Sequence, residues 1–488
     1  MSIAKNTAFM TFASVGQKII SFVYFTLIAR TIGAEGTGKY FFALAFTTVF
    51  VIFVDLGLTN VLVREAAKQR DKMREYFSTV LSVKIILGIL TYAAAAVTIG
   101  ALGYPVETRH LVYLSAVTML FDSLHLTIYG VLRAVGDLKW EAISIVGSQA
   151  ITLVLGSIFL YTGQPLIYLI LAFTISSFLN VIYASVVLWR KYGISLKAKF
   201  DAAAFGYLGK IAVPFAIAAI FARVYSYADT LILSKLAGDQ AVGWYSVPYK
   251  ITFAFQFIPL ALIAALYPRF SEYFARDKKR LAYIFERGMK YLLIVAFPIA
   301  IGIAVLAHDI ITLVFKSQYL PSVLPLQILI VSLIFSFASF PIGAFLNACN
   351  KQATQTGIVG LVMAANIALN LYLIPKFGVA GAASAAFIGN VLLAVLGYAV
   401  VPRVASISHS FLLKTVLQLS VSAGVMGVAV SYANVYTHVA IAIAVGAVVY
   451  PVMLFVTKAI TTDQLREALS LLVKRDSSTS VEDSLRSE

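Results

Sequence analysis

The sequence predicts an all-α polytopic membrane protein of about 14 transmembrane helices, with two parallel six-helix repeats and two further C-terminal helices. Three observations predict this fold class. Hydrophobic residues make up 60% of the 488 residues and charged residues only 12%, whereas roughly a quarter of a soluble domain is charged. Apolar stretches of about 20 residues, the length that spans a bilayer, recur along the chain. The two halves of the chain also resemble each other.

The apolar stretches define the expected spans in order. Each is long enough to cross a bilayer as a helix. Six spans per half is an even number, so both halves would enter the membrane from the same side and form parallel repeats. We expect the spans at residues 8–29, 40–63, 79–102, 111–132, 142–161, 166–189, 208–232, 245–267, 289–307, 323–346, 356–374, 379–401, 411–432 and 439–457.

The spans divide the chain into four expected parts. An N-terminal six-helix lobe covers residues 1–199, and a second six-helix lobe covers residues 200–403. Two additional transmembrane helices follow at 404–460. Residues 461–488 are expected to form a cytoplasmic amphipathic helix and a disordered tail, because leucines recur on one helical face up to Arg475 and the rest is polar.

An internal repeat relates the two halves. A shift of 205 residues places Lys18 on Arg223 without any gap. An internal repeat in a wholly helical membrane protein is typical of a transporter built from two bundles around a central site. The same shift aligns Ser21 with Ser226, Gly33 with Gly238, Gly38 with Gly243, Tyr40 with Tyr245, and Arg64 with Arg269.

The net charge of +16 has a topological explanation. Most lysines and arginines lie on the even-numbered links between spans, and the largest cluster lies at residues 269–290. Positive residues collect on the cytoplasmic side of a membrane. The sequence therefore predicts a multi-pass protein of the cell (inner) membrane with both termini in the cytoplasm. No nucleic-acid partner is expected.

Four predicted helices carry polar side chains on one face inside the membrane. An ionisable group at the bilayer centre costs at least about 2.5–3.5 kcal/mol, so each needs an interior partner or water. Lys18 and Arg223 occupy matching positions and would present cations to an anion, although either could instead snorkel or pair with an acid. The expected polar lining of the same cavity is Ser14, Ser21, Ser226, Thr118, Ser332 and Ser336.

Acidic residues inside the spans are the candidates for coupling to H⁺ or Na⁺. Asp122 and His125 lie on the longest polar stripe and form either a proton relay or a pair that satisfies itself. Asp55 is expected to pair with Arg64 or to cap a loop unless it has a transport role. Asp229 lies nearer the outer surface and suits a ligand or a gate. No metal site and no cofactor are expected.

Sequence patterns of enzymes are missing from the chain. Neither an H-E-x-x-H pair nor a P-loop occurs, and the external links are too short for a catalytic domain. Cys349 is the single cysteine, which excludes a disulfide framework and a thiolate cluster. We therefore expect a transporter rather than an enzyme, driven by an ion gradient, the membrane potential or the substrate gradient.

Three segments carry a family resemblance. They read I-A-R-T-I-G-A-E-G-T-G-K-Y from Ile28, A-D-T-L-I-L-S-K-L-A-G-D-Q-A-V-G-W-Y from Ala228, and N-L-Y-L-I-P-K-F-G-V-A-G-A-A-S-A from Asn370. These segments resemble polysaccharide transporters, including the Wzx-type O-antigen flippases. That family belongs to the multidrug/oligosaccharidyl-lipid/polysaccharide (MOP) exporter superfamily.

The resemblance implies a V-shaped pair of lobes that alternates between inward- and outward-open states. It also implies transfer of a polyprenyl-(pyro)phosphate-linked oligosaccharide from the cytoplasmic to the external leaflet through a cationic cavity. Lys250 occupies a suitable helix for this role, so Lys18, Arg223 and Lys250 would together hold the phosphate. The implied partners are the lipid-linked oligosaccharide, membrane lipids and other polysaccharide-assembly membrane proteins.

Two other functions remain open. An ion-coupled exporter of organic cations, of the MATE kind, would need carboxylates in the cavity, and Asp55 and Asp122 fit that requirement. A flippase for a lipid-linked peptidoglycan precursor would share the fold and the cationic cavity.

Overall fold

Helices account for nearly all regular structure in this protein. The computed structural model describes residues 3–460, and this part of the chain contains helices and turns without a strand. A helix satisfies its backbone hydrogen bonds within one segment, as a lipid environment demands. The helices are α1 (Ile3–Asp55), α2 (Leu58–Lys68), α3 (Met73–Ala101), α4 (Val106–Ala134), α5 (Lys139–Tyr161), α6 (Ile167–Tyr192), α7 (Ala202–Ala254), α8 (Phe257–Arg276), α9 (Lys278–Val305), α10 (Ala307–Phe315), α11 (Val323–Ala348), α12 (Gln352–Val400), α13 (His409–Tyr436) and α14 (Val439–Val456).

Eleven segments of the described chain are long and apolar enough to cross a membrane. The predicted class, an all-α polytopic membrane protein, is therefore confirmed. Three helices, α1, α7 and α12, each contain two helical legs joined at one glycine with non-helical backbone. Because these legs run on without a separate link, the structure shows 11 continuous segments, and the number of 14 crossings stays a prediction.

The helices α1 and α7 have the same build. Each is 53 residues long, and the glycines at their kinks, Gly33 and Gly238, are partners under the 205-residue shift. Their dihedral angles are nearly equal, with φ 75° and ψ −178° at Gly33 and φ 83° and ψ 178° at Gly238. Glycine adopts this region without steric cost. The sequence repeat is thus also a repeat of backbone geometry.

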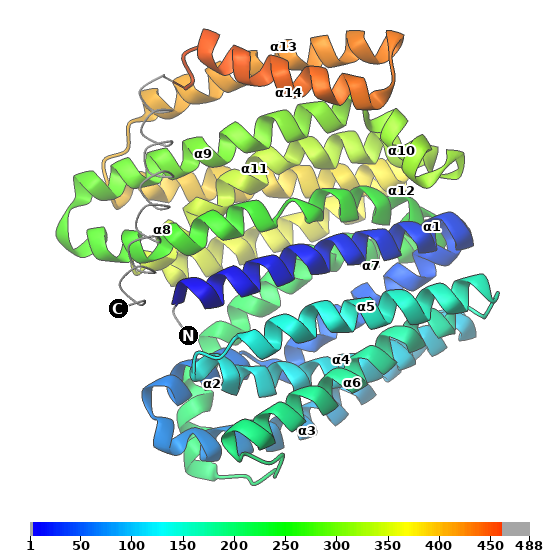
Figure 1. Cartoon of the computed structure of the whole chain (residues 1–488), viewed down its shortest axis with the longest axis vertical. Helices are drawn as coiled ribbons and strands as arrows, with labels where there is room; N and C mark the ends of the chain where they lie inside the picture. Colours follow the sequence, from blue (N-terminus) through cyan, green and yellow to red (C-terminus); the bar gives the residue numbers. More distant parts are fainter. Residues whose placement is uncertain (1–2, 461–488) are drawn as a thin grey trace, which may run out of the picture.

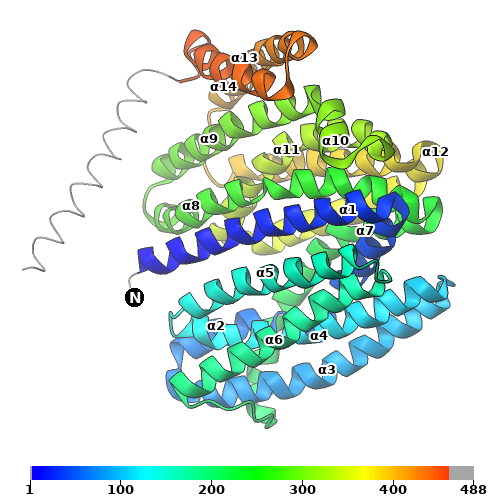
Figure 2. The same cartoon turned by 45° about the vertical axis from the view of Figure 1, so that its right-hand side comes forward.

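The helices form two groups with α1 and α7 between them. Helices α2 to α6 lie on one side and α8 to α12 on the other, while α13 and α14 lie beyond α9 at the edge of the molecule (Figures 1 and 2). Helix α1 packs along α7. We call α1–α6 the first bundle and α7–α12 the second bundle. The domain boundaries at residues 199 and 403 stay predictions, and the tail predicted at 461–488 lies outside the described residues.

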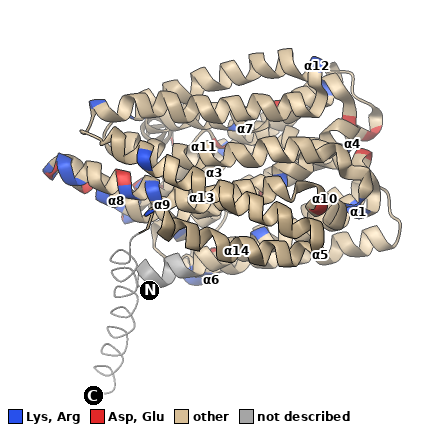
Figure 3. Ribbon diagram, turned by 90° about the horizontal axis from the view of Figure 1, so that it is seen from above, with Lys and Arg blue, Asp and Glu red and all other residues tan. Residues whose placement is uncertain are grey.

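The two ends of the bundles differ in chemistry. The kink end holds Gly33, Gly238 and the short η2 helix Ser317–Ser322. The opposite end, which we call the basic end, holds the connections from α2 to α3 and from α8 to α9. Lysines and arginines gather where α8 and α9 meet (Figure 3). This separation of charge fits a protein whose two ends face different sides of a membrane.

Candidate functional site

Aromatic rings from both legs of α1 and both legs of α7 form one cluster. The aromatic cluster consists of Phe25, Phe41, Tyr227, Tyr249 and Phe253. Tyr249 is its centre, because its ring stacks on Phe253 with centroids 5.8 Å apart. It also lies 5.6 Å from Phe41 and 6.1 Å from Tyr227. The rings come from both bundles, so the cluster lies at the boundary between them.

Lys18 contacts this cluster from the first bundle. Its ammonium lies 4.0 Å from the centroid of the Phe253 ring. A cation over an aromatic face is attracted by the ring quadrupole, and the contact strengthens where water is excluded. Lys18 itself is half-buried. The lysine of one bundle thus reaches a ring of the other.

Lys250 approaches the cluster from the second bundle. Its ammonium lies 5.6 Å from the Phe25 ring and 5.7 Å from the Phe41 ring. The ammonium groups of Lys18 and Lys250 thus both lie over rings of the same aromatic cluster. Two like charges held near each other raise the affinity of the space between them for an anion, because the anion relieves the repulsion.

Arg223 lies on the same side of α7 as the cluster. Phe221 and Tyr225 pack against Gly360 and Gly389 of α12, and a residue two positions away on a helix points to the opposite side. Arg223 therefore points away from α12. Tyr227, one turn further, contacts Tyr249. The Arg223 side chain is exposed, unlike that of Lys18.

The three cations lack acidic partners. Among the described residues, no carboxylate lies within 4.0 Å of the charged nitrogens of Lys18, Lys250 or Arg223. The alternative that Lys18 or Arg223 pairs with an acid to hold helices together is therefore not supported among these residues. Ser14 and Ser21 lie on α1 with Lys18 and are half-buried. The arrangement suits a ligand that carries a negative charge for the cations and an apolar or sugar group that packs against the rings.

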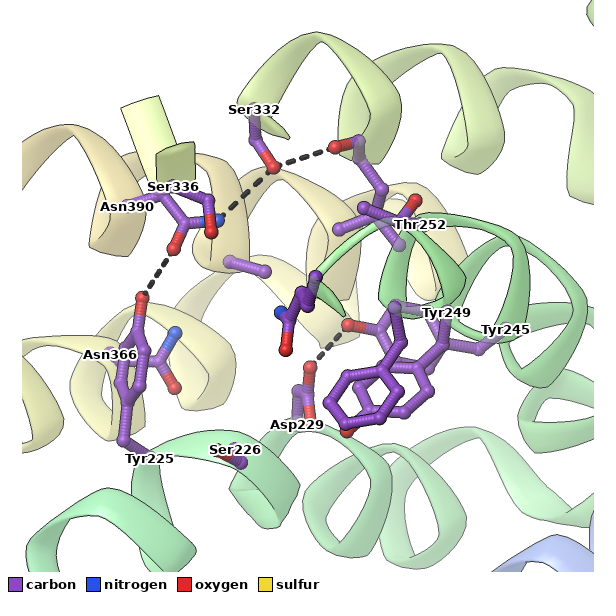
Figure 4. A pocket seen from close by; sticks show the side chains of 14 residues that line it. Tyr225, Ser226, Asp229, Tyr245, Tyr249, Thr252, Ser332, Ser336, Asn366 and Asn390 are labelled. Carbon is purple, nitrogen blue, oxygen red and sulfur yellow. Dashed lines mark hydrogen bonds between the residues drawn. The ribbon is translucent and has the colours of Figure 1, made fainter. Parts of the chain in front are cut away.

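A polar pocket of about 120 Å³ lies inside the second bundle (Figure 4). Four of its lining residues were predicted as site residues, namely Ser226, Asp229, Ser332 and Ser336. They come from α7 and α11, and the structure brings them together. Tyr249 and Phe253 line the same pocket, which therefore adjoins the aromatic cluster.

Asp229 is the buried acid of this pocket. Its carboxylate accepts hydrogen bonds from the Tyr245 hydroxyl and, at 2.8 Å, from the backbone N–H of Thr230. Across the pocket, the Tyr225 hydroxyl donates to the Asn390 side-chain oxygen at 3.1 Å, and the Asn390 amide donates to Ser332 at 3.1 Å. Hydroxyl, amide and carboxylate groups thus form the polar part of the lining, beside apolar side chains such as Leu329 and Ala386.

A second pocket of about 320 Å³ lies inside the first bundle. It holds Asp122 and His125, which are hydrogen-bonded at 3.1 Å. The Ser177 hydroxyl also donates to Asp122, at 2.6 Å. The His125 Nδ1 atom is buried without a hydrogen-bond partner in the described structure. The predicted pair is therefore present, in a pocket separate from that of Asp229.

Thr118, predicted to line the cavity, lines neither pocket. It is buried, and its hydroxyl bonds Thr174 of α6 at 2.7 Å. The periodicity placed it correctly on the polar face of α4, but the neighbouring helix covers that position.

The expected pairing of Asp55 with Arg64 is wrong, whereas the alternative of a loop cap fits the structure, because the Thr59 backbone N–H donates to Asp55 at 3.3 Å. Asp55 pairs with Lys84 of α3 at 2.5 Å and accepts a hydrogen bond from the Thr59 hydroxyl. Arg64 instead contacts Glu65 at 3.3 Å. Helix α1 ends at Asp55 and left-handed backbone follows at Leu56 and Gly57, so α2 changes direction and Arg64 is carried away from Asp55.

Sequence reasoning missed several residues of these sites. Lys84 is buried in the apolar run of α3, where a lone lysine should have been paired with the nearest buried acid. Asn366 and Asn390 line the second-bundle pocket. Their signal was an amide inside an apolar span, which is costly unless it is hydrogen-bonded. The aromatic residues of the cluster were hidden by the high aromatic content of the chain.

Two helix bundles, a boundary lined with cations and polar pockets inside both bundles define a polytopic membrane transporter. The polysaccharide biosynthesis protein family matches residues 3–274 of the sequence. This match covers more than half of the chain, so the protein belongs to that family. The MatE family matches residues 214–372.

Relatives support the same assignment. The probable low-salt glycan biosynthesis flippase Agl15 of Haloferax volcanii is 24% identical over 79% of this chain and 80% of its own length. A putative O-antigen transporter of Shigella flexneri is 24% identical over 78% of this chain and 94% of its own length. The predicted family resemblance is confirmed, and relatives named as flippases and transporters indicate a transport protein rather than an enzyme.

Solved structures share the fold. The lipid II flippase MurJ, in an inward closed conformation, has a TM-score of 0.75 with 17% identity and covers 91% of this chain and 97% of its own. An inward-facing multidrug resistance MATE family transporter of the MOP superfamily has a TM-score of 0.64 with 14% identity, covering 86% and 96%. The chain thus has the fold of the MOP superfamily.

Proposed function

We propose that the protein is a flippase for a polyprenyl-(pyro)phosphate-linked oligosaccharide. The phosphate would be held between Lys18 and Lys250, with Arg223 at the edge of the same space. The sugar would pass between the bundles beside the aromatic cluster, and the lipid tail would stay in the bilayer. The observation that carries this proposal is the meeting of unpaired cations from both bundles at one aromatic cluster.

Charge at the cluster favours this cargo over an organic cation. Each hydrogen bond from an ammonium to a phosphate is charge-assisted and roughly twice as strong as a neutral bond. An organic cation would instead meet two lysines, and the nearest pocket acid, Asp229, is engaged by Tyr245. The names of the relatives, a glycan flippase and an O-antigen transporter, agree with an anionic lipid-linked sugar.

The direction of transport follows from the charge of the two ends. The basic end would face the cytoplasm of a cell whose inner membrane holds the protein, and both termini would lie there. The basic connections would also concentrate anionic lipid substrate at that side. Other polysaccharide-assembly membrane proteins would act on the product after transfer.

The test is transport by a double variant. Lys18→Ala with Lys250→Ala should abolish export of lipid-linked sugar in flippase-deficient bacteria while the protein remains folded in the membrane. Lys376→Ala, which removes an exposed lysine over the Tyr372 ring, is the matched control and should leave export unchanged. Normal export by the double variant would refute the phosphate-binding role of these lysines.

We also propose that transport is coupled to H⁺ or Na⁺ through the pocket acids. Asp229 lies in an oxygen-lined pocket that suits a small cation, and Asp122 with His125 suits a proton. Transport rates are measured in sealed vesicles with an imposed gradient. If Na⁺ is the coupling ion, Asp229→Asn should make transport independent of the sodium gradient. If H⁺ is the coupling ion, Asp122→Asn should make transport independent of the proton gradient. Retention of gradient dependence in both variants would exclude both pockets as the coupling sites.

A further inference from the structure

Two helix legs touch through their backbones at the kink end. A β-carbon added to Gly38 would lie 1.8 Å from the carbonyl oxygen of Asp239. One added to Gly243 would lie 1.8 Å from the carbonyl oxygen of Ala34. Small residues allow membrane helices to approach this closely. We call these two contacts the glycine seam.

The seam is reciprocal. The 205-residue shift that relates the two halves converts Ala34 into Asp239 and Gly38 into Gly243. Each contact is therefore the image of the other under the repeat, as an interface between two similar bundles around a shared axis requires. The second leg of α1 meets the second leg of α7 along this line.

A side chain cannot fit into the seam as it stands. Real β-carbons essentially never approach another heavy atom more closely than 3.0 Å. The obstacle at both positions is a carbonyl oxygen of a helix backbone, which cannot rotate away as a side chain can. An added methyl group would therefore have to push the two legs apart.

Polar contacts between the halves surround the seam. The Tyr104 hydroxyl bonds Ser234 at 3.2 Å, and the Lys235 ammonium donates to the Leu102 carbonyl at 2.7 Å. The Tyr319 hydroxyl donates to Thr37 at 3.0 Å. All three bonds join the first half of the chain to the second half. They therefore help to hold the two halves together near the kink end.

We propose that the glycine seam closes the kink end of the transport path, and that the path opens there when the two legs part. This proposal rests on the proposed flippase function, because that function defines what moves along the path. The closure itself is argued only from the contacts of the glycine seam. A methyl group at either glycine shifts the protein toward the state that is open at the kink end. Because both contacts belong to one interface, the effect of the second methyl group is smaller than that of the first.

The test measures the width of the kink end without substrate. Spin labels are attached at Gln164→Cys and Lys376→Cys, one exposed position on each bundle, in protein whose Cys349 is replaced by Ser. Distances are recorded by pulsed electron resonance in lipid. In Gly38→Ala and in Gly243→Ala, the population with the longer distance should rise at least twofold. Gly147→Ala is the matched control, because a β-carbon there meets nothing within 4 Å.

Unchanged distances in both folded alanine variants would overturn the seam. If the alanine variants do not fold, Tyr319→Phe decides, since it removes the bonds of the hydroxyl to Thr37 and to the Ala29 carbonyl and adds no bulk. It should move the same population in the same direction by a smaller amount, and an unchanged distribution would again overturn the proposal. The distance measurement uses no substrate. A negative result would therefore not affect the proposed cargo, which the export assay with the lysine variants tests separately.

Discussion

The two bundles share their backbone geometry but handle buried charge differently. Inside the first bundle, Asp55 pairs with Lys84, Arg133 pairs with Glu141, and His125 is hydrogen-bonded to Asp122. The repeat places neutral residues at the corresponding positions of the second bundle. The shift of 205 residues gives Leu260 and Met289 for Asp55 and Lys84. Further along the chain the shift is 214 residues, which gives Ser336 and Ser339 for Asp122 and His125, and Asn347 and Gln355 for Arg133 and Glu141. The second bundle in turn holds Asp229, where the first has Tyr24. Duplication thus fixed the helix path, while the interior chemistry of each half changed independently.

The largest effect on export is expected at Lys18, and it should separate the two cations at matching positions. Lys18→Ala should lower export at least about tenfold, because loss of one charge-assisted hydrogen bond costs about 1.5–3 kcal/mol. Arg223→Ala should lower export less than about threefold, since its exposed side chain is screened by water. Initial rates in proteoliposomes measure both. Equal losses would show that the two halves contribute equally to the site.

The largest effect on stability is expected for the Asp55–Lys84 pair. Lys84→Ala should destabilise the protein by about 3–5 kcal/mol, because it leaves an uncompensated carboxylate in a largely buried place. The double variant Asp55→Leu with Lys84→Met copies the second bundle and should lose much less. Thermal unfolding in detergent measures both variants. A double variant as unstable as the single one would show that apolar residues can replace this ion pair only in the surroundings of the second bundle.

A smaller effect is expected at the Arg133–Glu141 pair. The Glu141 side chain is 2% exposed and that of Arg133 33% exposed, so Glu141→Gln leaves an arginine that water can reach. The expected loss is about 1–3 kcal/mol. Arg133→Asn with Glu141→Gln copies the two amide residues of the second bundle, Asn347 and Gln355, and should recover part of that loss, as measured by melting temperature. No recovery would mean that two amides cannot replace the ion pair in the first bundle.

The smallest effect is expected at Ser177. Ser177→Ala removes one hydrogen bond to Asp122 and should cost about 1 kcal/mol of stability. Ser332→Ala, which removes one bond from Asn390 in the second bundle, is the matched variant and should cost a similar amount. A much larger loss at Ser177 would indicate that it holds the Asp122–His125 pair in place.

The fold could be predicted from the sequence because apolar length and repeat spacing report on membrane spans directly. The sequence predicted links at residues 30–39 and 375–378, but it could not show that helix continues through these links up to the single glycines Gly33 and Gly378. The site was predicted in part. Helical periodicity placed Ser226, Asp229, Ser332 and Ser336 on polar faces, and these faces meet in one pocket.

Partners across helices were beyond the reach of the sequence. Periodicity identifies the face on which a side chain lies, but the neighbour that it meets depends on helix packing. For this reason Asp55 was assigned to Arg64, nearby in the chain, and not to Lys84, which is near it in space. The aromatic ring under Lys18 belongs to the other half of the chain and could not be identified for the same reason.

In the proposed orientation, with the kink end outside the cell, the turn at Gly33 has a consequence for the cell surface. The chain passes from one leg of α1 to the next through a single residue, and the same happens at Gly238 and Gly378. These three connections therefore expose little polypeptide at that end to which a protease, an antibody or a bacteriophage could bind. Helices α8 and α9 project at the opposite end (Figure 1). Enzymatic shaving of intact cells should leave such a protein whole, whereas inside-out vesicles should expose it to cleavage.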